Sequence, residues 1–307
     1  MVIGRFAPSP SGRMHFGNIY ACLISYLSAK KSGGRWILRI EDLDRQRCKK
    51  EYSELLIDDL HWLGFDWDEG PGKQDGENFF QSQRNALYEE FFHLLEEQNL
   101  IYDCFCTRSD LFSSSAPHNS DGTPVYLGRC RNLSPEQKEL LLQKKNPTKR
   151  IFVPDEVVSF VDGHYGKQEI SLFKDSGDFI VRRADGNFPY NLAVVVDDAL
   201  MGVNEIVRGR DLLSSTHQQL YLYKKLDFKI PEFFHIPLIV NIEGRRLSKR
   251  DKDLDMGFLR ANFSREDIIG KIMNLCGFTE KIEKMSLSEA ISVFDKEALP
   301  KKDILLS

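Results

Sequence analysis

The sequence has no apolar run long enough to cross a bilayer, which needs about 20 consecutive apolar residues, and no strong excess of charge. Its 42 lysines and arginines stand against 46 aspartates and glutamates, a formal net charge of −4. The N-terminus lacks the basic, apolar and small-residue layout of a signal peptide. We therefore expect a cytoplasmic protein without membrane contact. An RNA-binding surface would have to be local, and the candidate basic pairs are Lys144-Lys145, Lys149-Arg150, Arg182-Arg183 and Arg245-Arg246.

Cysteine is scarce, with six in 307 residues, and their uneven spacing argues against a disulfide framework. Cys104, Cys106 and Cys130 lie close in sequence and predict a structural zinc site with one ion per chain. Zinc takes four ligands, and the candidates for the fourth are His118 and Tyr126. Imidazole is the commoner ligand, and the alternative to any metal is three free, partly buried thiols. We interpret the remaining cysteines as packing residues: Cys22, Cys48 and Cys276.

The overall composition is typical of a folded protein, with 41% hydrophobic and 29% charged residues. The length predicts one large or two modest domains. In the first hundred residues, 36–40 is interpreted as a buried strand, whereas 46–63 and 79–98 have helical spacing. This alternation predicts an α/β fold whose parallel strands are joined by crossover helices.

The later sequence predicts elements of mixed type, separated by a polar loop. The segment between residues 152 and 207 is strand-rich, and it includes a hairpin turn. Helical spacing returns towards the C-terminus, where a serine precedes the pattern as an N-cap. The predicted elements are a loop at 113–122, strands at 179–181 and 190–196 around a turn at 183–187, a helix at 214–225, and a helix at 266–276 with Ser264 as its N-cap.

The most informative segment is RFAPSPSGRMHFGN at residues 5–18. It follows a short apolar start and opens into an amphipathic stretch, so it predicts a strand, a loop rich in proline and glycine, and a helix. The start of a helix favours phosphate because its N–H groups are unpaired and its dipole is positive there. His15 stands where an imidazole could donate to a phosphate oxygen. The alternative is an ordinary turn with a surface histidine.

A second segment, RRLSKRD at residues 245–251, follows the apolar run 236–240. Alone, such a basic loop is most often a solvated run of charge. Together with the loop at His15, it has the character of the second half of an ATP-binding clamp.

These segments resemble the class I aminoacyl-tRNA synthetases of the glutamate branch. HFGN at residues 15–18 stands in place of the HIGH signature, and LSKR at 247–250 stands in place of KMSKS. RIEDLD at 39–44 resembles the RIEDTD element of that branch, with Leu43 in place of threonine. The resemblance extends from residue 3 to about residue 260, and the three motifs occur in the family's order.

The resemblance implies an α/β fold of class I synthetase type: a Rossmann-like parallel sheet with an inserted zinc-bearing subdomain and a short helical stem. Residues 1–98 and 189–240 would form the two halves of the catalytic domain. Residues 99–188 would form an inserted zinc and acceptor-type subdomain, and 241–307 the LSKR loop and helical stem, with no anticodon-binding domain. The family pattern Cys-x-Cys, Tyr-x-x-x-Cys favours Tyr126 over His118 as the fourth zinc ligand.

The resemblance also implies the activation of L-glutamate with ATP, which brings its own Mg²⁺. His15 and Lys249 would be catalytic, and the ATP-binding residues would be His15, Gly17, Asn18, Ser248 and Lys249. Two arginines suit a dicarboxylate because guanidinium pairs with carboxylate in a bidentate manner, although each could instead be an ordinary surface or ion-paired residue. The implied glutamate-binding residues are Arg5, Phe6, Ala7, Pro8, Ser9, Glu41, Tyr190 and Arg208.

Only 57 residues follow Arg250, and in this the sequence resembles the family of glutamyl-queuosine tRNA(Asp) synthetases. Those short relatives of glutamyl-tRNA synthetase activate glutamate without tRNA and transfer it to the queuosine base at the wobble position of tRNA(Asp). The implied partner is an anticodon stem-loop that carries queuosine, and we expect no obligate protein partner. The alternatives are a truncated glutamyl-tRNA synthetase that charges the 3′ end, a glutaminyl relative, and a non-catalytic RNA- or protein-binding module.

Overall fold

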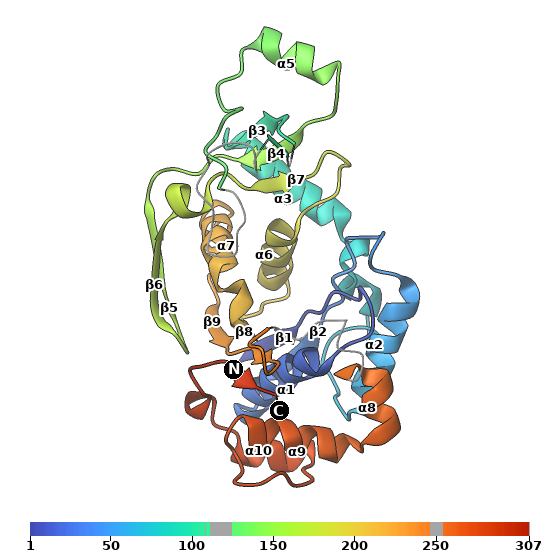
Figure 1. The fold of residues 1–307 in the computed structure, drawn as a ribbon. Helices are drawn as coiled ribbons and strands as arrows, with labels where there is room; N and C mark the ends of the chain where they lie inside the picture. Colours follow the sequence, from blue (N-terminus) through green and yellow to red (C-terminus); the bar gives the residue numbers. More distant parts are fainter. Residues whose placement is uncertain (108, 111–124, 246–253, 307) are drawn as a thin grey trace.

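The computed structural model describes residues 1–107, 109–110, 125–245 and 254–306 (Figure 1). Parallel strands lie at its centre. β1 (Ile3–Phe6) pairs with β2 (Arg35–Leu38), and β8 (Glu205–Gly209) pairs with β9 (Glu232–Ile236). The two pairs adjoin, since β1 contacts β8 and the N–H of Asn204 donates to the carbonyl of Ile3. The predicted α/β fold with parallel strands is confirmed.

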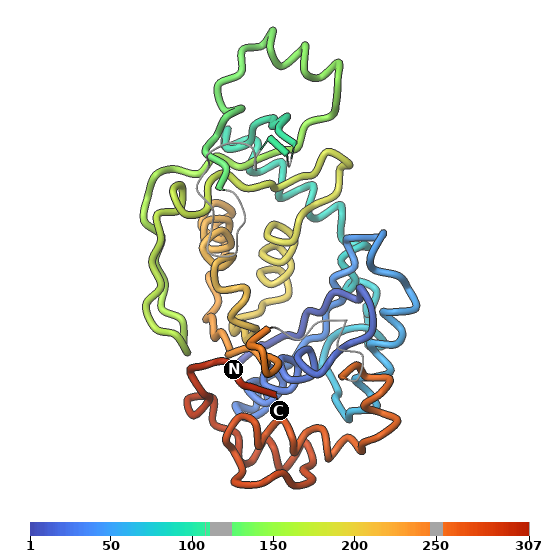
Figure 2. The backbone as a smooth tube through the Cα atoms, in the orientation of Figure 1, coloured from blue at the N-terminus to red at the C-terminus, as the bar shows by residue number. Residues whose placement is uncertain are grey.

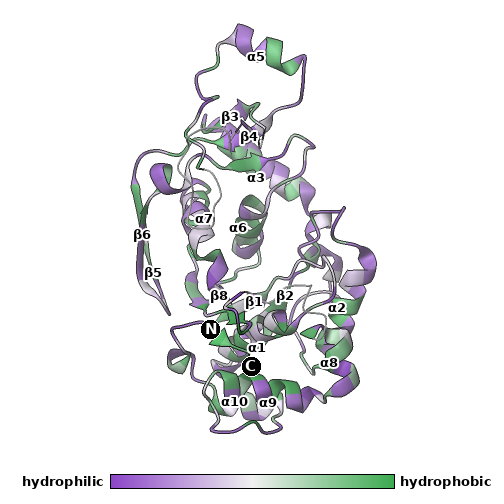
Figure 3. Cartoon of the chain, in the orientation of Figure 1, coloured by the Kyte–Doolittle hydropathy of each residue, from purple (hydrophilic) through white to green (hydrophobic). Residues whose placement is uncertain are grey.

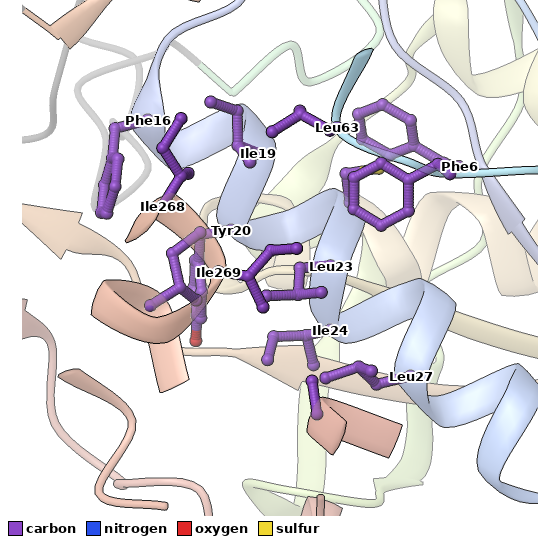
Figure 4. Packing of buried hydrophobic residues seen from close by; sticks show 14 of the residues in the cluster. Phe6, Phe16, Ile19, Tyr20, Leu23, Ile24, Leu27, Leu63, Ile268 and Ile269 are labelled. Atoms are coloured by element: carbon purple, nitrogen blue, oxygen red, sulfur yellow. The ribbon is translucent and has the colours of Figure 1, made fainter. Parts of the chain in front are cut away.

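Helices connect the paired strands, as the sequence predicts. α1 (Phe16–Lys31) follows β1, and α7 (Leu213–Lys225) joins β8 to β9. Leucines at four-residue spacing along α1 pack among Phe6, Leu63, Ile268 and Ile269 (Figure 4). A fully buried leucine contributes about 1.5–3 kcal/mol relative to an exposed one. This packing fixes the start of α1 relative to the strands.

The helix predicted at residues 79–98 begins later than expected. After α2 (Lys50–Trp62), the chain forms two short 3₁₀ turns, and α3 spans only Asn85–Glu97. The cause is tertiary pairing: the N–H of Ile40 donates to the carbonyl of Phe79, and the N–H of Gln81 donates to the carbonyl of Ile40. This pairing holds the chain out of a helix until residue 85.

The strand predicted at residues 190–196 is wrong, because these residues begin α6 (Tyr190–Leu200). The run is buried on nearly every side, so it shows neither alternation nor a helical stripe, and short apolar runs of this kind do not distinguish helix from strand. Figure 3 shows α6 as mostly hydrophobic. The turn at 183–187 does form, with the N–H of Arg183 donating to the carbonyl of Asn187 and Gly186 at φ +85°.

A second group of strands lies at the end of the molecule away from α9 and α10 (Figure 1). β3 (Ile101–Cys104), β4 (Thr148–Ile151) and β7 (Ile180–Arg182) form an antiparallel sheet, and α5 (Pro135–Leu142) lies beside it. The hairpin of β5 (Val157–Asp162) and β6 (Gly166–Ser171) leaves this group and reaches β9. The predicted loop at 113–122 lies outside the described residues.

Helices of the C-terminal part pack against α1 (Figure 2). Ser264 caps α9 as predicted, accepting a hydrogen bond from the N–H of Asp267. In the described part of the chain, no helix combines the length and apolar character needed to span a membrane. The elements of this part are β10 (Ile239–Val240), α8 (Met256–Asn262), α9 (Arg265–Leu275), α10 (Leu287–Val293) and β11 (Ile304–Leu305), which pairs parallel with β10.

Candidate active site

A cavity of about 580 Å³ lies beyond the carboxyl ends of the parallel strands, where ligands bind in open α/β sheets. It brings together every predicted ATP-binding and glutamate-binding residue that the structure describes. These lining residues are Arg5, Phe6, Ala7, Pro8, Ser9, His15, Gly17, Asn18, Glu41, Tyr190 and Arg208.

His15 is the N-cap of α1, directly at the cavity wall. Its N–H donates to Oδ1 of Asn18 at 3.0 Å. A Cβ on Gly17 would lie 3.2 Å from the His15 ring, so the glycine allows the imidazole to approach the backbone. The first turn of α1 contains no acidic residue. The site therefore has the positive end of a helix dipole and no carboxylate on the helix start to oppose an anion.

The loop before α1 is held to the start of α8. The N–H of Met256 donates to the carbonyl of Met14 at 2.9 Å, and Asp255 caps α8 by accepting from two N–H groups. Ser248 and Lys249, the two predicted ATP-binding residues of the second motif, lie outside the described residues. Their roles stay predictions.

Arg5, on β1, is a buried residue with a carboxylate partner. Its Nε lies 3.3 Å from Oδ1 of Asp198, and Nη1 of Arg39 donates to the same oxygen at 2.7 Å. Burial opposes ionisation of Asp198, but the two guanidinium groups lower its pKa. The positive charge of Arg5 is thus partly compensated inside the protein. Arg5 is therefore an ion-paired arginine, which was the alternative considered from the sequence, and it also lines the cavity.

Glu41, just after β2, is a buried carboxyl at the cavity wall. Burial raises its pKa to about 7, against the opposing effect of Arg39 and Arg5. Arg39 donates to Oε1 of Glu41 at 3.4 Å. A cation that entered the cavity beside Glu41 would favour the ionised form.

Arg208, on β8, has different partners from those of Arg5. Its Nε lies 3.0 Å from Nε2 of His235, Nη2 donates to Oγ1 of Thr216 at 2.8 Å, and Nη1 donates to the hydroxyl of Tyr190 at 3.4 Å. Within the residues described, no carboxylate forms an ion pair with Arg208. Tyr190 reaches the cavity from the first turn of α6 rather than from a strand.

The three clustered cysteines also meet in space. The Sγ atoms of Cys104, Cys106 and Cys130 lie within 4.8 Å of one another. The Tyr126 hydroxyl accepts from the N–H of Cys130 at 2.8 Å and lies 4.0 Å from Sγ of Cys106. Nε of Arg150 lies 3.3 Å from Sγ of Cys104. Three converging thiols are a donor set suited to a metal ion such as zinc, and the Tyr126 hydroxyl lies beside them. His118 lies outside the described residues.

Several residues beside the cavity were not singled out from the sequence. Arg39 and Asp198 are fully buried under Arg5, and Asp162 with His235 lies behind Arg208. The only available signal was a charged residue beside an apolar run, such as Arg39 after WIL or the pair Asp197-Asp198 after VVV. Such a residue must be paired when buried, but the sequence does not identify its partner.

A family model described as "tRNA synthetases class I (E and Q), catalytic domain" matches residues 1–304. A glutamyl-Q tRNA(Asp) synthetase of Symbiobacterium thermophilum is 43% identical, over 99% of this chain and 95% of that protein. A glutamate–tRNA ligase of Sulfurihydrogenibium is 40% identical, over 93% of this chain and 60% of that protein.

The fold resembles a solved glutamate tRNA ligase from Elizabethkingia meningosepticum, crystallised in complex with its amino acid. The TM-score is 0.82 at 27% identity, and the match covers 100% of this chain and 67% of the other.

Proposed function

The chain belongs to the class I tRNA synthetases for E and Q, and on that premise we propose that it activates L-glutamate with ATP and transfers it to the queuosine base of tRNA(Asp). As a member of this family it is an ATP-dependent ligase. The observation that carries the proposal is the match to glutamyl-Q tRNA(Asp) synthetases along nearly their whole length. The cytoplasmic location and the division into domains predicted from the sequence belong to the same proposal.

The amino acid occupies the cavity between Arg5, Glu41 and Arg208. Glu41 receives the α-ammonium group, because it is the acidic residue of this set. The two guanidinium groups receive the carboxylates, for which their planar donors are suited. The hydroxyl of Tyr190 lies beside Arg208, and the backbone and side chains of the strand end complete the wall: Phe6, Ala7, Pro8 and Ser9.

ATP lies along the start of α1. His15, Gly17 and Asn18 contact the phosphates from this side, and Ser248 and Lys249 contact them from the second motif. An oxygen of the glutamate α-carboxylate forms a bond to the α-phosphorus, the bond to the β-phosphate bridging oxygen breaks, and pyrophosphate leaves with that electron pair. The protein's contribution is positioning and stabilisation of charge on the phosphoryl oxygens. Mg²⁺ accompanies ATP and offsets the phosphate charge.

A structural zinc ion is held by Cys104, Cys106, Cys130 and Tyr126, one per chain. The convergence of the three thiols and the phenol supports this set. The ion would cross-link β3 to the segment at 126–130. It takes no part in the activation step.

The acceptor is the queuosine-bearing anticodon stem-loop, with the wobble base turned out towards the adenylate, as single-stranded RNA recognition requires. The alternatives of 3′-end charging and of a non-catalytic binding module are not favoured. The chain covers 95% of the glutamyl-Q tRNA(Asp) synthetase of Symbiobacterium thermophilum but only 60% of the glutamate–tRNA ligase of Sulfurihydrogenibium.

Pyrophosphate exchange with glutamate and ATP tests the activation step, and we expect exchange without tRNA. Labelled glutamate is then offered to a free anticodon stem-loop with queuosine, to the same loop with guanosine at the wobble position, and to tRNA(Asp) that lacks its 3′-terminal adenosine. Transfer to the first and the third, but not to the second, supports the proposal. Transfer that requires the terminal adenosine and ignores the wobble base would assign 3′-end charging instead.

A further inference from the structure

The partner of Arg208 on the neighbouring strand is a histidine. Arg208 and His235 are register partners in the parallel β8–β9 pair, and Nε of Arg208 lies 3.0 Å from Nε2 of His235. The imidazole is fully buried. Because a guanidinium only donates, Nε2 of His235 must accept. The ring proton therefore resides on Nδ1.

Asp162, at the end of β5, accepts a hydrogen bond from the Nδ1–H group of His235. Nδ1 of His235 lies 2.6 Å from Oδ2 of Asp162. The aspartate is held by backbone groups as well, accepting from the N–H groups of His164, Tyr165 and His235. Although burial opposes it, the hydrogen bonds from His235 and from the N–H of Tyr165 lower the pKa of Asp162. Asp162 thus fixes both the tautomer and the orientation of His235.

The consequence is a difference between the two arginines of the cavity. Arg5 lies against the carboxylate of Asp198, whereas the hydrogen-bond partners of Arg208 in the described structure are all neutral: His235, Thr216 and Tyr190. The charge of Asp198 acts on Arg208 as well, but from beyond the distance of an ion pair. Burial lowers the pKa of His235 to about 4, against its hydrogen bond to Asp162 and together with the charge of Arg208, so the imidazole is neutral at pH 7. A buried cation without a counter-ion is costly, and an anionic ligand removes that cost.

We propose that His235 is a positioning residue for glutamate: oriented by Asp162 of the β5–β6 hairpin, it directs the Arg208 guanidinium into the cavity without placing a negative charge in contact with it. The inference rests on the proposed glutamate site. The negative charge of Asp162 is kept one imidazole away from Arg208, so the protein orients the arginine without neutralising it. The counter-ion of Arg208 is then the substrate's own carboxylate, which favours glutamate over the neutral amide of glutamine.

The test moves the negative charge of Asp162 to the position of His235. The double variant Asp162→Asn with His235→Glu keeps the net charge and sets a carboxylate beside Arg208. Its matched control is Asp162→Asn with His235→Gln, which has nearly the same shape and a neutral acceptor. A further control, His164→Gln, removes a buried histidine of the same hairpin that bonds to the carbonyl of Pro300 instead of to Arg208.

Calorimetric glutamate binding and the KM values for glutamate and ATP in pyrophosphate exchange are measured for each protein. We expect the Glu variant to bind glutamate about tenfold or more weakly than its Gln control, because a charge-assisted bond is lost. Its preference for glutamate over glutamine should fall, and its KM for ATP should match that of the control.

Equal glutamate affinity in the two double variants would overturn the inference, as would a parallel change in the KM for ATP. If the Glu variant does not fold, the glutamate affinities of His235→Gln and His235→Ala are compared instead. Only His235→Gln keeps an acceptor for Nε of Arg208, so it should bind glutamate more tightly than His235→Ala, and equal affinities would overturn the inference. A wild-type protein that shows no glutamate-dependent exchange refutes the proposed function instead, so the two failures are distinguishable.

Discussion

Arg13, in the loop before α1, donates two hydrogen bonds to Asp59 of α2, at 3.2 and 3.0 Å. Asp59 is fully buried, and its Oδ1 also accepts from Nη1 of Arg260 in α8 at 2.9 Å. One carboxylate therefore joins the loop that carries His15 to the helix that follows the LSKR motif. The loop before α1 and α8 are thus anchored to the same carboxylate.

Replacement of Asp59 by asparagine should raise the KM for ATP severalfold and leave glutamate affinity unchanged, because Arg13 loses its anionic partner and Arg260 loses one of its two. We expect a loss of about 1–3 kcal/mol in the free energy of unfolding, measured by denaturant titration. The matched control is Asp58→Asn, an exposed neighbour whose ion pair in the described structure is with Arg260, and for which the loss should be below about 1 kcal/mol. Equal KM values for ATP in the two variants would contradict the prediction.

Lys249→Ala should lower the rate of pyrophosphate exchange far more than it weakens glutamate binding. The lysine is assigned to phosphates whose charge is redistributed in the transition state, so its loss affects turnover rather than the amino-acid site. Exchange kinetics and glutamate calorimetry on the same protein provide the comparison. Lys252→Ala, in the same segment, is the control and should retain near wild-type turnover. A large loss of glutamate affinity in Lys249→Ala would refute the assignment.

Glutamate affinity should fall as the pH drops through about 7. Glu41 is half protonated near this pH because burial raises its pKa to about 7, with Arg39 and Arg5 opposing and Asp198 and Asp197 assisting the rise. Binding of an ammonium group requires the ionised form, so it releases a proton below pH 7. The affinity then decreases by up to about tenfold per pH unit.

Calorimetry at pH 6 and pH 8, in buffers of different ionisation enthalpy, measures both the affinity and the proton release. Glu41→Gln should bind glutamate weakly at both pH values and release no proton. A wild-type affinity that is constant between pH 6 and pH 8 would exclude Glu41 as the ammonium ligand.

The purified protein should contain one zinc ion per chain, and a chelator should lower its thermal stability, since metal-binding energy contributes to folding. Cys130→Ser should lose the metal, whereas Cys48→Ser, outside the cluster, should keep it. Metal content in Tyr126→Phe and His118→Ala separates the two candidates for the fourth ligand, and we expect the loss in Tyr126→Phe. Absence of zinc with all three cluster thiols freely reactive would eliminate the site.

The sequence alone determined the features that depend on neighbours along the chain. The strand, loop and helix around His15, the N-cap at Ser264 and the turn at 183–187 follow from local backbone preferences, and each forms as predicted. Motifs recognised by their order were sufficient to indicate the family. The close spacing of Cys104 and Cys106, with Cys130 a short segment away, was likewise enough to indicate a cluster.

Tertiary structure alone decided which distant groups share a buried environment. Residues 190–196 form a helix that the sequence pattern did not reveal, because a run enclosed on nearly every side shows no periodicity. α3 begins at Asn85 because Ile40 pairs with residues 79–81. Asp162 and His235 are 73 residues apart in sequence, and only the contact of the hairpin with β9 brings them together. A buried charge requires a partner, but which partner it meets is set by the packing of whole elements and not by local sequence.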